Sequence, residues 1–165
     1  TQTGIETMAM ATPLFTGIAT NEQATAVTQT LLDKFLKPGG FATTLVDTNQ
    51  QWDGNIGWAP LNYKAIAGMQ AAAGKYEGGQ GFMKEIADEA SYRWTSTNRM
   101  VYEHTGKLLE KYHVLDPHQR VTNGEYEVQE GFGWTNGVYS ALTRGVNLRL
   151  QAIKETRMSK LYLPL

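Results

Sequence analysis

Four stretches of the chain carry apolar residues at the spacing of an amphipathic helix, and long polar connections lie between them. In the first stretch these residues are Ala24, Val27, Leu31 and Phe35. Thr20 and Gln23 precede it in the pattern of a capping box, which predicts the start of a helix. The helix is expected to end at Pro38-Gly39-Gly40, because proline lacks the N–H and glycine tolerates positive φ.

Three further helices are predicted from the same periodicity. The second extends from about Asn62 to Lys75, and the third extends from Phe82 to about Lys111. The fourth begins near Trp134. Its apolar positions are Val138, Leu142, Val146 and Ile153. The predicted fold class is therefore all-α.

Two long connections, residues 37–61 and 113–131, join the first helix to the second and the third to the fourth. Connections of this length without a helix are uncommon unless they are functional. If the helices alternate in direction, both connections emerge at the same end of the fold and lie side by side. Strand signal is weak, and at most residues 43–45 are expected to pair briefly.

Composition excludes several classes of function. The 165 residues suit one domain, and the net charge of -1 comes without a basic block, so no nucleic-acid partner is expected. The chain has no cysteine, which excludes disulfides and thiolate metal sites. Mean hydropathy is -0.39, and no apolar run approaches the ~20 residues that span a bilayer, so no membrane partner is expected.

The connections contain two aromatic loops, residues 50–60 and 124–137, which place aromatic rings beside carboxylates, amides and glycines. This mixture is typical of a sugar site, because rings stack on C–H faces while carboxylates and amides bind pairs of hydroxyls. The candidate ring faces are Trp52, Trp58, Phe132 and Trp134. The candidate polar groups are Gln51, Asp53, Glu125 and Gln129.

A structural role competes with the binding role for the tryptophans, because large aromatic side chains commonly anchor loops to a core. The two roles weigh equally for Trp58 and Trp134, and binding is favoured for Trp52. Glycoside hydrolysis would also need two carboxyl groups on opposite sides of the scissile bond. Composition alone does not rank the candidates. These are Asp53, Glu110, Asp116, Glu125, Glu127 and Glu130.

No metal and no cofactor are expected. The histidines His104, His113 and His118 do not share a helical face with the four-residue spacing that suits a metal. The chain also lacks a Gly-x-Ser-x-Gly nucleophile motif and a glycine loop for phosphate.

Residues 51–60 carry the most specific pattern, Gln-Trp-Asp-Gly-Asn-Ile-Gly-Trp-Ala-Pro. Apart from Asn55 in place of a proline, it matches the trehalase signature Gln-Trp-Asp-x-Pro-x-Gly-Trp-x-Pro. Leu-Glu-Lys-Tyr at 109–112 and Gly-Phe-Gly-Trp-Thr-Asn-Gly-Val at 131–138 also match, in the family's order. The chain therefore resembles the C-terminal third or so of the trehalases, glycoside hydrolases that split α,α-trehalose into two glucoses.

The resemblance implies that residues 1–165 are a C-terminal segment of an (α/α)6 barrel, a toroid of helical hairpins with the site at its centre. It also implies an inverting mechanism, in which an acid protonates the glycosidic oxygen and a carboxylate activates water. Glu110 takes the position of the general base, and Glu125 the position of a carboxylate that binds substrate hydroxyls. The rest of the expected substrate site is Gln51, Trp52, Asp53, Phe132 and Trp134.

The resemblance also implies partners. The family's general acid is an Asp in an upstream segment outside these residues, so the expected partner holds that segment, as a second chain or as the rest of the same polypeptide. Trehalose is the expected substrate, and a periplasmic or extracellular location is favoured while a cytoplasmic one stays open. One alternative is a non-catalytic sugar-binding or scaffold module derived from the same fold. Another is an (α/α)6 enzyme for a different sugar.

Overall fold

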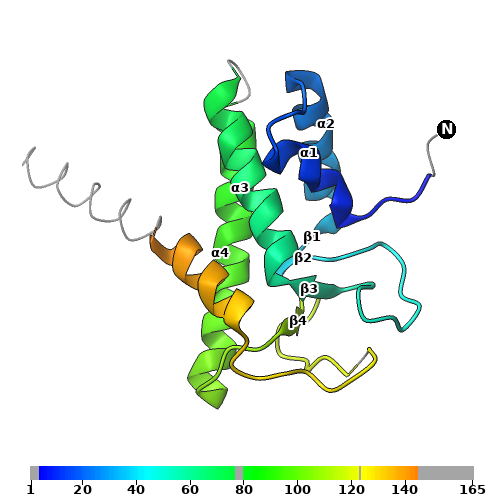
Figure 1. The fold of residues 1–165 in the computed structure, drawn as a ribbon, viewed down its shortest axis with the longest axis vertical. Coiled ribbons are helices and arrows are strands. Elements are labelled where there is room, and N and C mark those ends of the chain that lie inside the picture. Colours follow the sequence, from blue (N-terminus) through cyan, green and yellow to red (C-terminus); the bar gives the residue numbers. More distant parts are fainter. Residues whose placement is uncertain (1–3, 77–79, 123, 145–165) are drawn as a thin grey trace, which may run out of the picture.

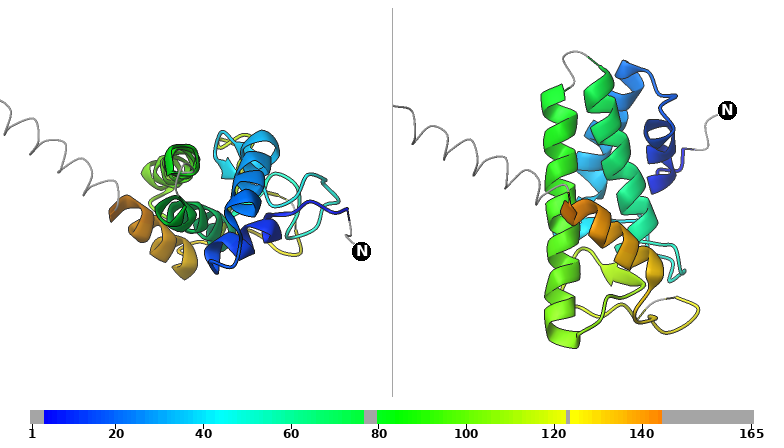
Figure 2. Two further views of the ribbon diagram at one scale, coloured as in Figure 1. Left: turned by 90° about the horizontal axis from the view of Figure 1, so that it is seen from above. Right: turned by 60° about the vertical axis from the view of Figure 1, so that its left-hand side comes forward.

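Two long antiparallel helices form the centre of the structure (Figure 1). The residues described by this computed structural model are 4–76, 80–122 and 124–144. Helix α3, Ala59–Lys75, packs along helix α4, Gln80–Thr105, and the two lie side by side in every view (Figures 1 and 2). Helix α1, Thr12–Phe15, packs against α3 after a 3₁₀ turn, and helix α2, Asn21–Thr30, lies beside α3 and α4.

Helix α2 begins with the capping box that the sequence predicts. The Thr20 hydroxyl accepts a hydrogen bond from Gln23 N at 3.2 Å, and Gln23 Oε1 accepts one from Thr20 N at 2.9 Å. The helical segment ends earlier than predicted, in a π turn, Leu31–Phe35. The chain then forms a hairpin of strands β1, Leu36–Lys37, and β2, Gly40–Phe41, which the sequence did not indicate.

The prediction that the third helix reaches Lys111 is wrong. Helix α4 ends at Thr105, where Gly106 adopts a φ of 71° and donates its N–H to Tyr102 O at 2.7 Å. Glycine reaches this left-handed conformation without strain, which makes it a common helix terminator. Lys111–His113 form strand β4 instead, because the backbone groups of these residues pair with another strand.

Strand β3, Ile56–Trp58, pairs antiparallel with β4 and aligns Trp58 with Lys111. The pairing joins a strand just before α3 to a strand just after α4. Both long connections therefore lie at the same end of the helix pair, at the bottom of Figure 1, as the alternation of helices predicts. Of residues 43–45, only Thr44 pairs, in an isolated bridge with Thr7.

The buried side chains form one main core between the helices. Trp94 of α4 is fully buried and meets the Tyr112 ring edge-on, with 5.4 Å between centroids. The fourth predicted helix is present at residues 133–144, where Val138 and Leu142 contact this core. The predicted positions Val146 and Ile153 lie outside the described residues. None of the helices described is long and apolar enough to cross a membrane.

The second predicted helix begins at Ala59 rather than at Asn62, with Pro60 in its first turn. Proline suits this position, because the first N–H groups of a helix have no partner within the helix. Asn62 is instead buried within the first turns, where its side chain accepts a hydrogen bond from Phe41 N at 2.8 Å and donates to Trp58 O at 3.1 Å. This side chain ties the hairpin of β1 and β2 to the start of α3.

Gly57→Ala is expected to destabilise the protein by about 1–3 kcal/mol, because the new methyl group overpacks the core. A Cβ at Gly57 would lie 2.3 Å from Cγ1 of Val114 and 3.0 Å from Cζ3 of Trp94. Thermal unfolding measures the effect as a lower Tm. Gly74→Ala in α3 is the matched control, because nothing lies within 4 Å of its added Cβ and alanine favours the helix. Equal Tm values for the two variants would contradict the packing argument.

Candidate active site

The two aromatic loops meet in a cluster of rings. Trp52 stacks on Trp58 with 3.9 Å between centroids and 11° between planes. Trp134 meets both rings edge-on, at 6.0 Å and 5.6 Å. Phe132 lies 4.8 Å from Trp134. Trp58 is 1% exposed and anchors the cluster in the core. Trp52 is 46% exposed, so part of its ring surface is available to a ligand.

Glu110 contacts Trp134 of this cluster and lies in the short segment that leads into β4. Its backbone N–H donates to Gln129 O at 2.9 Å, and its carbonyl accepts a hydrogen bond from Trp134 Nε1 at 3.1 Å. The Thr135 hydroxyl donates to Leu109 O at 2.7 Å. The second aromatic loop and the helix after it therefore hold the Glu110 backbone from both sides.

The carboxylate of Glu110 is buried, with 1% of the residue exposed. The Tyr126 hydroxyl donates a hydrogen bond to Oε1 at 2.7 Å. Oε2 is also buried, but it has no hydrogen-bond partner among the described residues. A buried acceptor left unpaired costs about 1–3 kcal/mol, and more when it is charged, so such an atom calls for a partner from outside the described chain.

Gln51 connects the first aromatic loop to β4 and to the second loop. Its side-chain oxygen accepts hydrogen bonds from Lys111 Nζ at 2.9 Å and from Glu125 N at 3.1 Å. Lys111 is fully buried, with Nζ 5.6 Å from the Trp58 ring centroid. Burial lowers the pKa of Lys111, and the negative charge of Glu110 opposes part of this shift. The site therefore holds a buried lysine whose pKa is affected by the charge of Glu110.

Gly124 allows the second loop to approach Gln51. Its φ is 118°, in the region that favours glycine, and an added Cβ would lie 1.9 Å from Gln51 Oε1 and 2.6 Å from Lys111 Nζ. A side chain at this position would therefore push the loop away from Gln51.

Asp53 differs from the other predicted site residues, because its carboxylate binds groups of its own connection, residues 37–61. Oδ1 accepts hydrogen bonds from the Thr44 hydroxyl at 2.7 Å and from Gly54 N at 3.0 Å. Oδ2 accepts from the Thr48 hydroxyl at 2.7 Å and from Thr48 N. Desolvation raises the pKa of Asp53, but the hydrogen bonds from Thr48, Thr44 and Gly54 outweigh it and hold the pKa well below its ordinary value.

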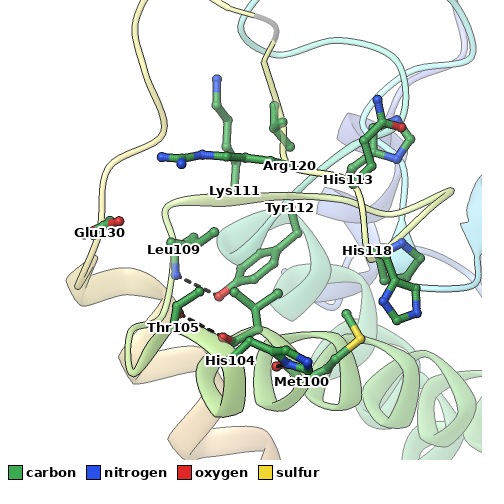
Figure 3. Close-up of a pocket in the computed structure, with 14 residues that line it drawn as sticks. Met100, His104, Thr105, Leu109, Lys111, Tyr112, His113, His118, Arg120 and Glu130 are labelled. Atoms are coloured by element: carbon green, nitrogen blue, oxygen red, sulfur yellow. Dashed lines mark hydrogen bonds between the residues drawn. The ribbon is translucent and has the colours of Figure 1, made fainter.

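A cavity of about 270 Å³ lies apart from the aromatic cluster, between the end of α4 and the chain after β4 (Figure 3). His104, His113 and His118 all line it, yet the part of the chain described here contains no group of three side chains placed to hold a metal ion. Glu110 and the four rings of the cluster do not line this cavity, whereas their neighbours Leu109, Lys111 and Tyr112 do.

The structure brings most of the predicted site residues together. The residues that meet around β3 and β4 are Gln51, Trp52, Glu110, Glu125, Phe132 and Trp134. The carboxylate of Asp53 lies instead within its own loop, so any binding role for it stays a prediction. Sequence reasoning missed Lys111 and Tyr126. The contacts of Lys111 and Tyr126 join loops that are distant in the sequence, so no local pattern indicates them. The one available signal was that each residue is next to a predicted site residue, Glu110 or Glu125.

The fold and the site have counterparts among known proteins. The neutral trehalase of Saccharomyces cerevisiae matches 86% of this chain with a TM-score of 0.65 and 27% identity, and the match covers 24% of that chain. The periplasmic trehalase of Pseudomonas aeruginosa is 38% identical over 132 residues, which are 80% of this chain and 23% of that protein. These likenesses define the fold class: the chain is mostly helical and forms part of an (α/α)6 barrel.

The family model for trehalase matches residues 1–147. The chain belongs to the trehalase family, which confirms the resemblance carried by residues 51–60. It spans about a quarter of the length of the two relatives, at 23% and 24%. The roles of individual side chains rest on the geometry above and stay predictions.

Asp53→Asn is expected to destabilise the protein by about 1.5–3 kcal/mol at neutral pH, because hydrogen bonds to a charged group are lost. The folded-state pKa of Asp53 lies below its ordinary value of 3.8, so its stabilising effect is present above that pH and is lost as the pH falls further. Urea unfolding at a series of pH values should show the largest difference from the parent protein at neutral pH and a shrinking difference below 3.8.

Asp33→Asn is the control for this experiment. Asp33 is exposed and accepts a hydrogen bond from Gln29 Nε2 on the helix surface. Surface substitutions of this kind usually change stability by within about 0.5 kcal/mol. If the stability difference between Asp53→Asn and the parent protein did not depend on pH, the charge of Asp53 would contribute nothing to the free energy of unfolding.

Proposed function

We propose that this chain supplies the general base and part of the sugar site of an enzyme that hydrolyses α,α-trehalose to two glucose molecules with inversion. The observation that carries the proposal is Glu110. It is a buried carboxylate whose backbone contacts the aromatic cluster, with one oxygen held by Tyr126 and the other without a partner among the described residues. Membership of the trehalase family supports trehalose as the substrate.

In the proposed reaction Glu110 accepts a proton from a water molecule, whose oxygen attacks the anomeric carbon. The glycosidic bond breaks on the opposite face, and a general acid protonates the leaving oxygen. A water molecule between the base and the sugar is the feature that produces inversion. The proposal assigns Oε2 as the acceptor for this water, because it has no hydrogen-bond donor among the described residues.

The general acid of the proposed reaction is an Asp in an upstream segment of the family's domain. The chain covers 23% of the Pseudomonas relative, which leaves room for that segment in the whole enzyme. We therefore take residues 1–165 as a C-terminal segment of the catalytic domain. The name of that relative supports a periplasmic location for this protein as well.

The sugar binds against the two aromatic loops in this proposal. Trp52 presents its exposed face, and Phe132 and Trp134 form the adjoining wall. Glu125 is exposed, and its carboxylate is available for sugar hydroxyls. The backbone N–H of Glu125 donates to Gln51 Oε1, which holds Glu125 in place. Gln51 completes the polar side of the site.

Glu110→Gln should lower kcat by about 10²–10⁴-fold or more, because the amide cannot accept the proton of the water. Trehalose binding should change little, since the side chain keeps its size. Glucose release by the enzyme that contains this chain and its upstream segment measures the rate. Glu127→Gln is the matched control, because Glu127 is an exposed carboxylate of the same loop. A rate for Glu110→Gln equal to the control would place the base elsewhere.

Azide extends this test to the mechanism. In Glu110→Ala, the azide anion attacks the anomeric carbon without base assistance while the general acid still protonates the leaving glucose. Restored turnover with formation of β-glucosyl azide would support an inverting base at Glu110. Retained trehalose binding without any hydrolysis by the unmodified enzyme would support the non-catalytic module instead.

Trp52→Ala is expected to weaken trehalose binding by about 10-fold, because a stacking surface is lost. Calorimetry in the Glu110→Gln background measures the affinity without turnover. Tyr92→Ala is the control, because Tyr92 is an exposed aromatic residue of α4 outside the aromatic cluster. Equal affinities for the two variants would remove Trp52 from the sugar site.

A further inference from the structure

Tyr126 makes a side-chain contact with Glu110 that the proposed reaction does not yet use. The Tyr126 hydroxyl lies 2.7 Å from Glu110 Oε1 and donates its proton to that oxygen. The other carboxylate oxygen, Oε2, is buried and has no hydrogen-bond partner in the described part of the chain. One oxygen of the carboxylate therefore accepts a hydrogen bond, and the other accepts none from the described residues.

We propose that Tyr126 is a positioning residue, which fixes the carboxylate of Glu110 so that Oε2 faces the reacting water. The proposal rests on the function proposed above, since Tyr126 has this role only if Glu110 is the general base. Tyr126 itself touches neither water nor sugar in this role. It acts through the orientation of Glu110.

The backbone contacts explain why a positioning group is needed. The N–H of Glu110 is bonded to Gln129 O and its carbonyl to Trp134 Nε1, and these bonds fix the main chain but not the orientation of the carboxylate. A rotated carboxylate would exchange its two oxygens or turn away from the water. A hydrogen bond to a charged oxygen is stronger than one between neutral groups, and it favours a single orientation. Tyr126 supplies that bond.

Tyr126 is suited to be a permanent donor. The hydrogen bond to Glu110, burial and the negative charge of Glu110 raise the pKa of Tyr126 above its ordinary value of 10.0. The hydroxyl therefore keeps its proton throughout the neutral range and cannot act as a competing base. In this contact the hydroxyl donates and the carboxylate accepts.

The loop that carries Tyr126 also links the base to the sugar side of the site. The neighbouring Glu125 is fixed by its N–H to Gln51 Oε1, and Lys111 Nζ lies 5.7 Å from the Tyr126 ring centroid. The close approach at Gly124 brings this loop against Gln51. A displacement of the loop would therefore move Glu125 and release Glu110 together. The orientation of the base depends on the same loop that is proposed to bind the sugar.

The test is Tyr126→Phe in the assembled enzyme, meaning this chain with its upstream segment. The phenyl ring keeps the packing and removes only the hydroxyl. Loss of a hydrogen bond to a charged group should lower kcat by roughly 10- to 100-fold, while KM changes by less than about threefold because the sugar contacts remain. Tyr102→Phe is the matched control, because Tyr102 is exposed on α4 and its substitution should leave kcat unchanged.

A second variant separates positioning from a structural role. In the Glu110→Gln background, adding Tyr126→Phe should change the residual rate by less than about twofold, since there is no carboxylate left to orient. An equal loss in both backgrounds, or a kcat within threefold of the parent enzyme, would overturn the proposal. If Glu110→Gln itself retained the full rate, the proposed function would fail and the positioning role with it. A normal loss in Glu110→Gln with an unchanged Tyr126→Phe would remove the positioning role alone.

Discussion

The pairing of β3 with β4 is the constraint on which the rest of the site depends. Only three residues of each strand take part, Ile56–Trp58 and Lys111–His113, yet one strand precedes α3 and the other follows α4 in the sequence. The pairing places Trp58 opposite Lys111 and so fixes the first aromatic loop beside the segment that carries Glu110. Without it, helices α3 and α4 could still pack, but their connections would have no defined relation to each other.

Packing explains why so short a pairing can be specific. Gly57, the central residue of β3, has no room for a side chain because Val114 and Trp94 fill the space next to its Cα. Val114 also donates its N–H to Asn55 O and accepts from Gly39 N, which extends the contact beyond the strands. A shift of one residue would bring a side chain into this space and turn Trp58 away from the cluster. The register is therefore set by the core rather than by the strand hydrogen bonds alone.

Polar contacts between the loops are few, and each involves a buried group. Gln51 receives hydrogen bonds from Lys111 and from the backbone of Glu125, while Glu110 receives one from Tyr126. Buried groups of this kind specify a single arrangement when they are satisfied and are costly when they are not. Among the described residues, the exceptions at this site are Glu110 Oε2, Gln51 Nε2 and Trp58 Nε1, which are buried without a hydrogen-bond partner. A site that binds and activates water needs a hydrogen-bond acceptor that the protein itself leaves without a donor.

The sequence by itself determined the helices and the chemical character of the loops. Local signals were sufficient for this, since the capping box at Thr20 and the apolar spacing act within a few residues. The tertiary structure alone decided that Lys111 leaves the helical pattern for a strand, that Asp53 turns its carboxylate into its own loop and that Tyr126 reaches Glu110. These outcomes depend on partners far away in the sequence, and no local preference encodes the distance or direction of such a partner.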